Sequence, residues 1–128
     1  MEMREINGIT LYELPNYAYQ KFKQVTRGNE RITHDEAQRK LTRNIMLGRT
    51  VHKDSNYNQR IIMYGYLKIR INTTIDGREV ITGIWNLDVP DPYFMLHQKN
   101  HRKISKKLGL KVEENKKHVE RKQKELVK

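Results

Sequence analysis

Aromatic and cationic side chains alternate with apolar ones along residues 61–70. Because successive side chains of a β-strand point to opposite faces, this pattern predicts a strand with one apolar and one polar face. Aromatic rings stack on nucleic-acid bases and cations pair with phosphates, so the polar face suits a nucleic acid. An ordinary half-buried strand with a solvated face is the alternative. The predicted polar face holds Tyr64, Tyr66, Lys68 and Arg70.

The same residue types could cleave RNA without a metal. Attack of a ribose 2′-hydroxyl on its own phosphate needs a base, a proton donor and cations around the phosphorane. We take His34, Arg43 and Tyr64 as the candidate catalytic residues. For His34, an exposed residue in the first turn of a helix is the alternative interpretation.

Other chemistries find little support in the sequence. The chain has no cysteine, no Gly-x-Ser-x-Gly and no phosphate-binding glycine loop. Its five histidines are scattered, and no pair has the spacing of metal ligands. We therefore expect no metal site and no cofactor.

The charge favours a polyanionic partner. The 128 residues include 26 Lys and Arg against 15 Asp and Glu, a net charge of +11. Residues 1–96 hold 14 basic and 11 acidic residues, whereas residues 97–128 hold 12 basic and 4 acidic ones. This contrast predicts a compact body over 1–96 and a basic helical arm or tail over 97–128. The structural alternative for that arm is a solvated helix that serves only solubility.

Local signals predict an α+β body with two N-terminal helices packed on a small antiparallel sheet. Asn7-Gly8 predicts a short hairpin or an edge strand, and Pro15 can open the first helix. Thr33 to Glu36 forms a capping box that begins a helix over about 34–47. Residues 49–58 are predicted as a loop, and 60–74 and 79–85 as strands joined by a two-residue turn at Asp76-Gly77. The segment 88–93 is expected to break regular structure, and a partly packed helix is expected around 98–108.

This order of elements resembles the small metal-free ribonucleases of the RelE-like toxin class and the related colicin-type nucleases. The resemblance covers roughly residues 10–87 and lies in the layout and in the sequences Tyr-Gly-Tyr-Leu-Lys-Ile-Arg and Val-Ile-Thr-Gly-Ile-Trp. It implies that the polar sheet face holds RNA, with roles for Arg43, Arg60, Tyr64, Lys68 and Arg70. No catalytic tail of that class can be matched, because the C-terminal segment is long and generically basic. The composition also resembles small proteins of phages and mobile elements in low-GC bacteria.

These observations predict a basic nucleic-acid-binding protein, with RNA favoured over DNA. The alternatives are a metal-free toxin-type endoribonuclease and a phage-encoded effector that binds and inhibits a host protein, such as an acidic or nucleic-acid-bound one. The N-terminus lacks an apolar signal segment and no apolar run could span a bilayer, so we expect a cytoplasmic protein without a membrane partner. The predicted nucleic-acid contacts are Arg39, Lys40, Arg60, Tyr66, Lys68, Arg70, Arg102, Lys103, Lys106 and Lys107.

Overall fold

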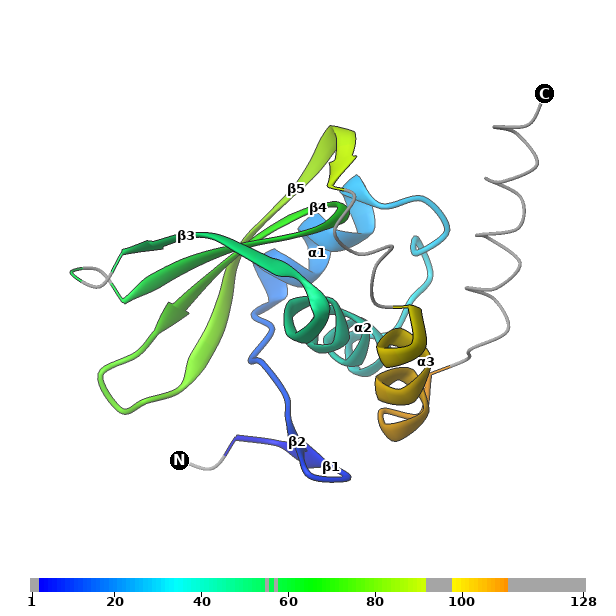
Figure 1. Ribbon diagram of the computed structural model, residues 1–128, viewed down its shortest axis with the longest axis horizontal. Helices are drawn as coiled ribbons and strands as arrows, with labels where there is room; N and C mark the ends of the chain where they lie inside the picture. Colours follow the sequence, from blue (N-terminus) through cyan, green and yellow to red (C-terminus); the bar gives the residue numbers. More distant parts are fainter. Residues whose placement is uncertain (1–2, 55, 57, 92–97, 111–128) are drawn as a thin grey trace.

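The computed structural model describes residues 3–54, 56, 58–91 and 98–110. Its elements show an α+β fold, as the sequence predicts (Figure 1). None of the helices in these ranges is long and apolar enough to cross a membrane. The elements are β1 (Glu5–Ile6), β2 (Ile9–Thr10), α1 (Asn16–Val25), α2 (His34–Leu47), β3 (Arg49–Asp54), β4 (Gln59–Thr73), β5 (Glu79–Asp91) and α3 (Gln98–Lys107).

The N-terminal elements follow the local signals of the sequence. β1 and β2 pair as an antiparallel hairpin around Asn7 and Gly8, both of which have positive φ. α1 begins directly after Pro15, whose fixed φ suits a helix start. The predicted N-cap at Thr33 is confirmed, because the Thr33 side chain accepts a hydrogen bond from the Glu36 backbone N–H at 3.1 Å.

β3, β4 and β5 form an antiparallel sheet in that order. The predicted hairpin between β4 and β5 is confirmed, but its connection is longer than two residues. Thr74 donates its backbone N–H to Arg78 O at 2.8 Å, so Ile75, Asp76 and Gly77 make a three-residue loop. Gly77 has φ +85°, which is the position that favours glycine in such loops.

Two boundaries differ from the prediction. The segment predicted as a loop over 49–58 begins with strand β3, whose side chains are mostly exposed and polar and so carry no apolar alternation. β5 continues through Pro90 to Asp91, although Pro90 was expected to end regular structure. The register shifts by several residues there, from Leu67–Asn86 to Gly65–Asp91, and proline is tolerated at such irregular edge positions.

The core lies on one face of the sheet. Buried side chains of α1 and α2, among them Phe22 and Leu41, pack with Ile69, Ile71 and Ile81 of β4 and β5. A second cluster joins Leu108 and Leu110, beyond the end of α3, to Ile9 and Leu11 near the N-terminal hairpin. α3 therefore packs beside α2, at the opposite end of the molecule from the tip of the β4–β5 hairpin (Figure 1). Residues 111–128, the rest of the predicted basic arm, lie outside the described residues.

Candidate nucleic-acid interface

The face of the sheet opposite the helices is partly exposed and carries aromatic and cationic side chains. Leu67, Ile69 and Ile71 are buried against the helices, so the residues between them point the other way. The cross-strand pair Lys68–Trp85 brings the indole of β5 onto this face. We call it the open sheet face and define it by Tyr66, Lys68, Arg70 and Trp85.

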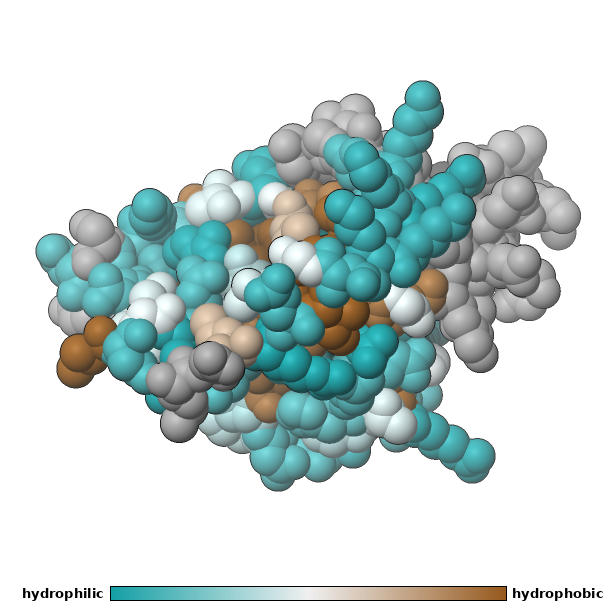
Figure 2. Space-filling model, turned by 90° about the horizontal axis from the view of Figure 1, so that it is seen from below, coloured by the Kyte–Doolittle hydropathy of each residue, from teal (hydrophilic) through white to brown (hydrophobic). Residues whose placement is uncertain are grey.

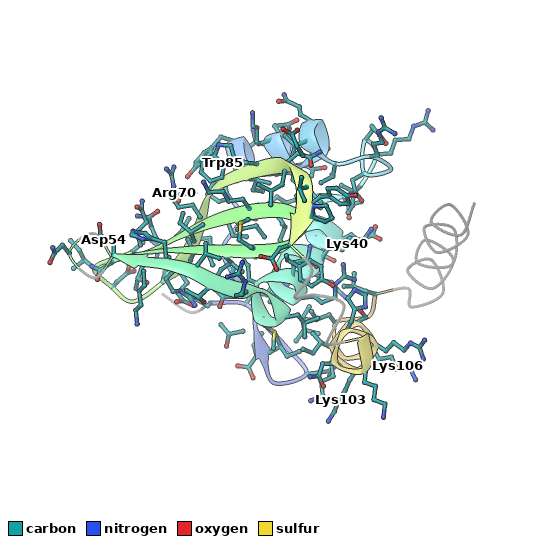
Figure 3. The ribbon with its side chains drawn as sticks, turned by 45° about the horizontal axis from the view of Figure 1, so that its top comes forward. Lys40, Asp54, Arg70, Trp85, Lys103 and Lys106 are labelled. Carbon is teal, nitrogen blue, oxygen red and sulfur yellow. The ribbon has the colours of Figure 1, made fainter. Side chains whose placement is uncertain are left out.

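The Trp85 indole lies between two cations. Lys68 Nζ is 5.2 Å and Arg70 Cζ is 5.4 Å from its ring centroid. The ring lies over Gly83, where an added Cβ would come within 2.5 Å of the indole. Gly83 therefore leaves room for the ring to lie flat on the strand. About two fifths of the surface of Trp85 stays exposed to solvent. Figure 3 shows Arg70 and Trp85 side by side on the sheet.

Neighbouring groups hold Arg70 in place without neutralising it. Arg70 donates from Nε to Thr82 Oγ1 at 3.0 Å and from Nη2 to the Thr82 carbonyl at 3.1 Å. Neither β4 nor residues 80–87 of β5 contain an aspartate or glutamate. The open sheet face thus combines the cations Lys68 and Arg70, of which Arg70 is held by hydrogen bonds, with an exposed aromatic ring, the combination that binds bases and phosphates of a single strand.

Tyr64 does not lie on this face, contrary to the prediction. The two-residue alternation breaks between Ile62 and Leu67, which are both buried against the helices. The break falls at Gly65, which has φ +57° and lies next to the register shift of β4. The Tyr64 ring instead stacks on His101 of α3, with ring centroids 6.3 Å apart and planes at 12°.

Two of the three predicted catalytic residues come together on the helix side. Burial lowers the pKa of Arg43, and the nearby Tyr64 opposes that shift. Burial also raises the pKa of Tyr64 to about 12, against the opposing effect of Arg43. Burial, Arg43 and Arg102 together lower the pKa of His101 to about 4. Arg43 therefore acts electrostatically on both Tyr64 and His101.

His34 is separate from this group. It lies nine residues before Arg43 on α2, which corresponds to about 13 Å along the helix axis. Its Nε2 is 2.6 Å from Leu14 O, and its ring makes an edge-on contact with Tyr19. The ring thus ties the start of α2 to the start of α1, which favours the structural interpretation.

Three other predicted contact residues have partners inside the protein. Arg39 pairs with Asp35 and donates to the Leu108 carbonyl at 2.9 Å, which fastens α3 to α2. Lys40 Nζ is 3.3 Å from Asn29 Oδ1. Arg60 pairs with Glu79 at 3.0 Å, away from the open sheet face.

The cations of α3 form a second basic surface. Arg102, Lys103, Lys106 and Lys107 are all exposed. Lys103 and Lys106 project from α3 away from Arg70 and Trp85 (Figure 3). The view from below, the side of α3 and the N-terminal hairpin, shows long hydrophilic side chains that project from the body (Figure 2).

Sequence reasoning missed Trp85 and His101 as site residues. Trp85 could have been found from the hairpin, because antiparallel pairing around Asp76-Gly77 places a residue near 85 beside Lys68. His101 offered no such signal, since nothing local connects it with Tyr64.

A family model named YorE matches residues 12–107, which covers both the open sheet face and the Arg43 region. The chain belongs to the YorE family. YorE is a name associated with phage proteins, in keeping with the predicted phage-type origin of this YorE chain. Comparisons with curated proteins and with solved structures gave no match.

Proposed function

We propose that this YorE-family chain binds single-stranded nucleic acid, RNA in preference to DNA, through the open sheet face. The observation that carries the proposal is the half-exposed Trp85 indole between Lys68 and Arg70. A base can stack on the indole or on Tyr66 while the two cations contact the flanking phosphates. RNA is favoured because proteins commonly read it as unpaired bases splayed over aromatic side chains. A cytoplasmic location fits such a partner.

α3 has a supporting role in this proposal. Its exposed Lys103 and Lys106 project away from the bases that would stack on Trp85, so they suit attraction of the polyanion and contacts with distant phosphates (Figure 3). Such contacts carry no sequence information. They strengthen binding at low salt, because each neutralised phosphate releases counterions from the strand.

The chain contains a single tryptophan, so intrinsic fluorescence reports directly on the proposed site. Titration with an oligouridylate should quench Trp85 emission saturably. The logarithm of the affinity should fall with the logarithm of the salt concentration, with a slope of about −0.7 per phosphate contacted. Binding seen by fluorescence anisotropy of a labelled oligonucleotide, without any change in Trp85 emission, would place the interface elsewhere.

A metal-free endoribonuclease is the second candidate, favoured by the proximity of Arg43, Tyr64 and His101. His101 would take the 2′-hydroxyl proton, the 2′-oxygen would attack phosphorus, and Tyr64 would protonate the departing 5′-oxygen. Arg43 would stabilise the phosphorane. The pKa values of about 4 and about 12 are far from neutrality, so both groups are weak at this task, which ranks cleavage below binding.

The cleavage hypothesis is tested with end-labelled RNA in EDTA. If the chain cleaves, Tyr64→Phe should lower the rate at saturating RNA on the order of a hundredfold, because it deletes only the proton-donating hydroxyl. Trp85→Phe serves as a control that should alter affinity and leave the saturated rate nearly unchanged. Intact RNA after prolonged incubation with the unchanged protein, under conditions where it binds, would remove this candidate.

A further inference from the structure

Arg43 is a buried cation between α2 and α3. Only 6% of its surface is exposed. Its Nε donates to Asn44 Oδ1 at 3.2 Å and its Nη1 to Ser105 Oγ at 3.3 Å. Both acceptors are neutral, and no aspartate or glutamate within the described ranges forms an ion pair with it. Buried arginines are normally paired with an anion, because an isolated charge is costly to remove from water.

Among the described residues, the aromatic groups beside Arg43 also carry no negative charge. Tyr64 and His101 stack on each other from β4 and α3. At neutral pH the phenol is protonated and the imidazole is neutral, so the charges near these two rings are the positive charge of Arg43 and, beside His101, that of Arg102. The phenol O–H, an imidazole N–H and the remaining guanidinium N–H groups are donors of the kind that an oxyanion accepts.

We propose that Arg43, Tyr64 and His101 form a binding site for a phosphate group. The planar guanidinium presents several N–H donors that match phosphate oxygens, and a bound phosphate would supply the negative charge that the described surroundings of Arg43 lack. The phosphate belongs either to the end of a polynucleotide or to a free nucleotide. Tyr64 lies on the helix side of β4, so this site is distinct from the open sheet face and does not depend on the function proposed for it.

The first test is an NMR titration of the histidine ring protons of the full-length protein, with and without inorganic phosphate at matched ionic strength. His101→Gln identifies the His101 signal. In chloride alone the pKa of His101 should lie near 4, and phosphate should raise it toward its ordinary value, because the anion offsets the positive charge of Arg43. His34, far from Arg43 on α2, is the internal control and should not respond. An unchanged pKa of His101 at saturating phosphate would overturn the proposal.

A second test measures thermal stabilisation. Phosphate well above its dissociation constant should raise the Tm of the unchanged protein by about 5 °C relative to chloride at the same ionic strength. Arg43→Gln should abolish this shift. Arg39→Gln, which also removes a guanidinium that holds α3, is the matched control and should keep it. The proposal fails if Arg43→Gln keeps the full shift; if that variant does not fold, the histidine titration of the unchanged protein decides alone.

The two sources of phosphate are separated by three probes in the same titration: uridine monophosphate, a 5′-phosphorylated oligouridylate and its 5′-hydroxyl counterpart. A His101 response to the phosphorylated oligonucleotide and not to its counterpart assigns a strand end, while a response to the monophosphate alone assigns a nucleotide. No response to any probe overturns the site. Trp85 fluorescence is read in parallel, so failure of this site and failure of the open sheet face are distinguished.

Discussion

A Lys68→Ala, Arg70→Ala double variant should bind oligouridylate about 100-fold more weakly than the unchanged protein. Each side chain is expected to make a charged contact with phosphate, worth about 1.5 kcal/mol or more, and both lie within 5.5 Å of the Trp85 ring. Anisotropy of a labelled oligonucleotide at low salt measures the affinity. The slope of the logarithm of the affinity against the logarithm of the salt concentration should also become shallower, by the contribution of about two phosphate contacts.

A Lys21→Ala, Arg31→Ala variant is the matched control for that experiment. Both residues are exposed and lie in α1 and in the connection before α2, and their replacement removes the same two charges. The control should lose only a few-fold in affinity, because it lowers the overall electrostatic attraction for the oligonucleotide and removes no direct contact with it. Equal losses in the two variants would mean that net charge alone governs binding, which would contradict a site on the open sheet face.

Leu108→Ala should destabilise the whole protein by about 2–5 kcal/mol, measured by urea unfolding. Leu108 is fully buried and packs with Ile9, Leu11 and Leu110, so its truncation leaves a cavity between the end of α3 and the N-terminal segment. Lys107→Ala, at the exposed neighbouring position, should change stability by less than about 0.5 kcal/mol. A variant in which α3 loses its helix while the rest unfolds at the original midpoint would show that α3 is an independent arm.

The Leu108→Ala variant also tests the predicted division of the chain into a compact body over 1–96 and a basic arm over 97–128. The sequence predicts a body over 1–96 because most of the excess positive charge follows it. Charge, however, does not report which few apolar residues are buried, and Leu108 and Leu110 are enough to fasten α3. A single cooperative transition in the unchanged protein, followed by circular dichroism and by Trp85 fluorescence, is the expected result.

The sequence by itself determined the elements whose causes are local. The cap at Thr33 depends on a hydrogen bond to a residue three positions away. The turns at Asn7-Gly8 and Gly77 depend on residues that tolerate positive φ. The alternation from Leu67 to Ile71 sets which side of β4 is buried. These rules placed Tyr66, Lys68 and Arg70 correctly on one face.

Only the tertiary structure decided the rest. The backbone conformation at Gly65 reverses the alternation and moves Tyr64 to the helix side of the sheet. The regular two-residue period of a strand could not predict this reversal. β3 is a strand because its backbone pairs with β4, not because its side chains show a pattern. Arg43 meets Ser105 and His101 only because Leu108 and Leu110 dock α3 beside α2. The Gly65 and β3 features depend on backbone conformation and pairing, and the docking of α3 joins residues distant in sequence, so side-chain composition and spacing alone could not reveal them.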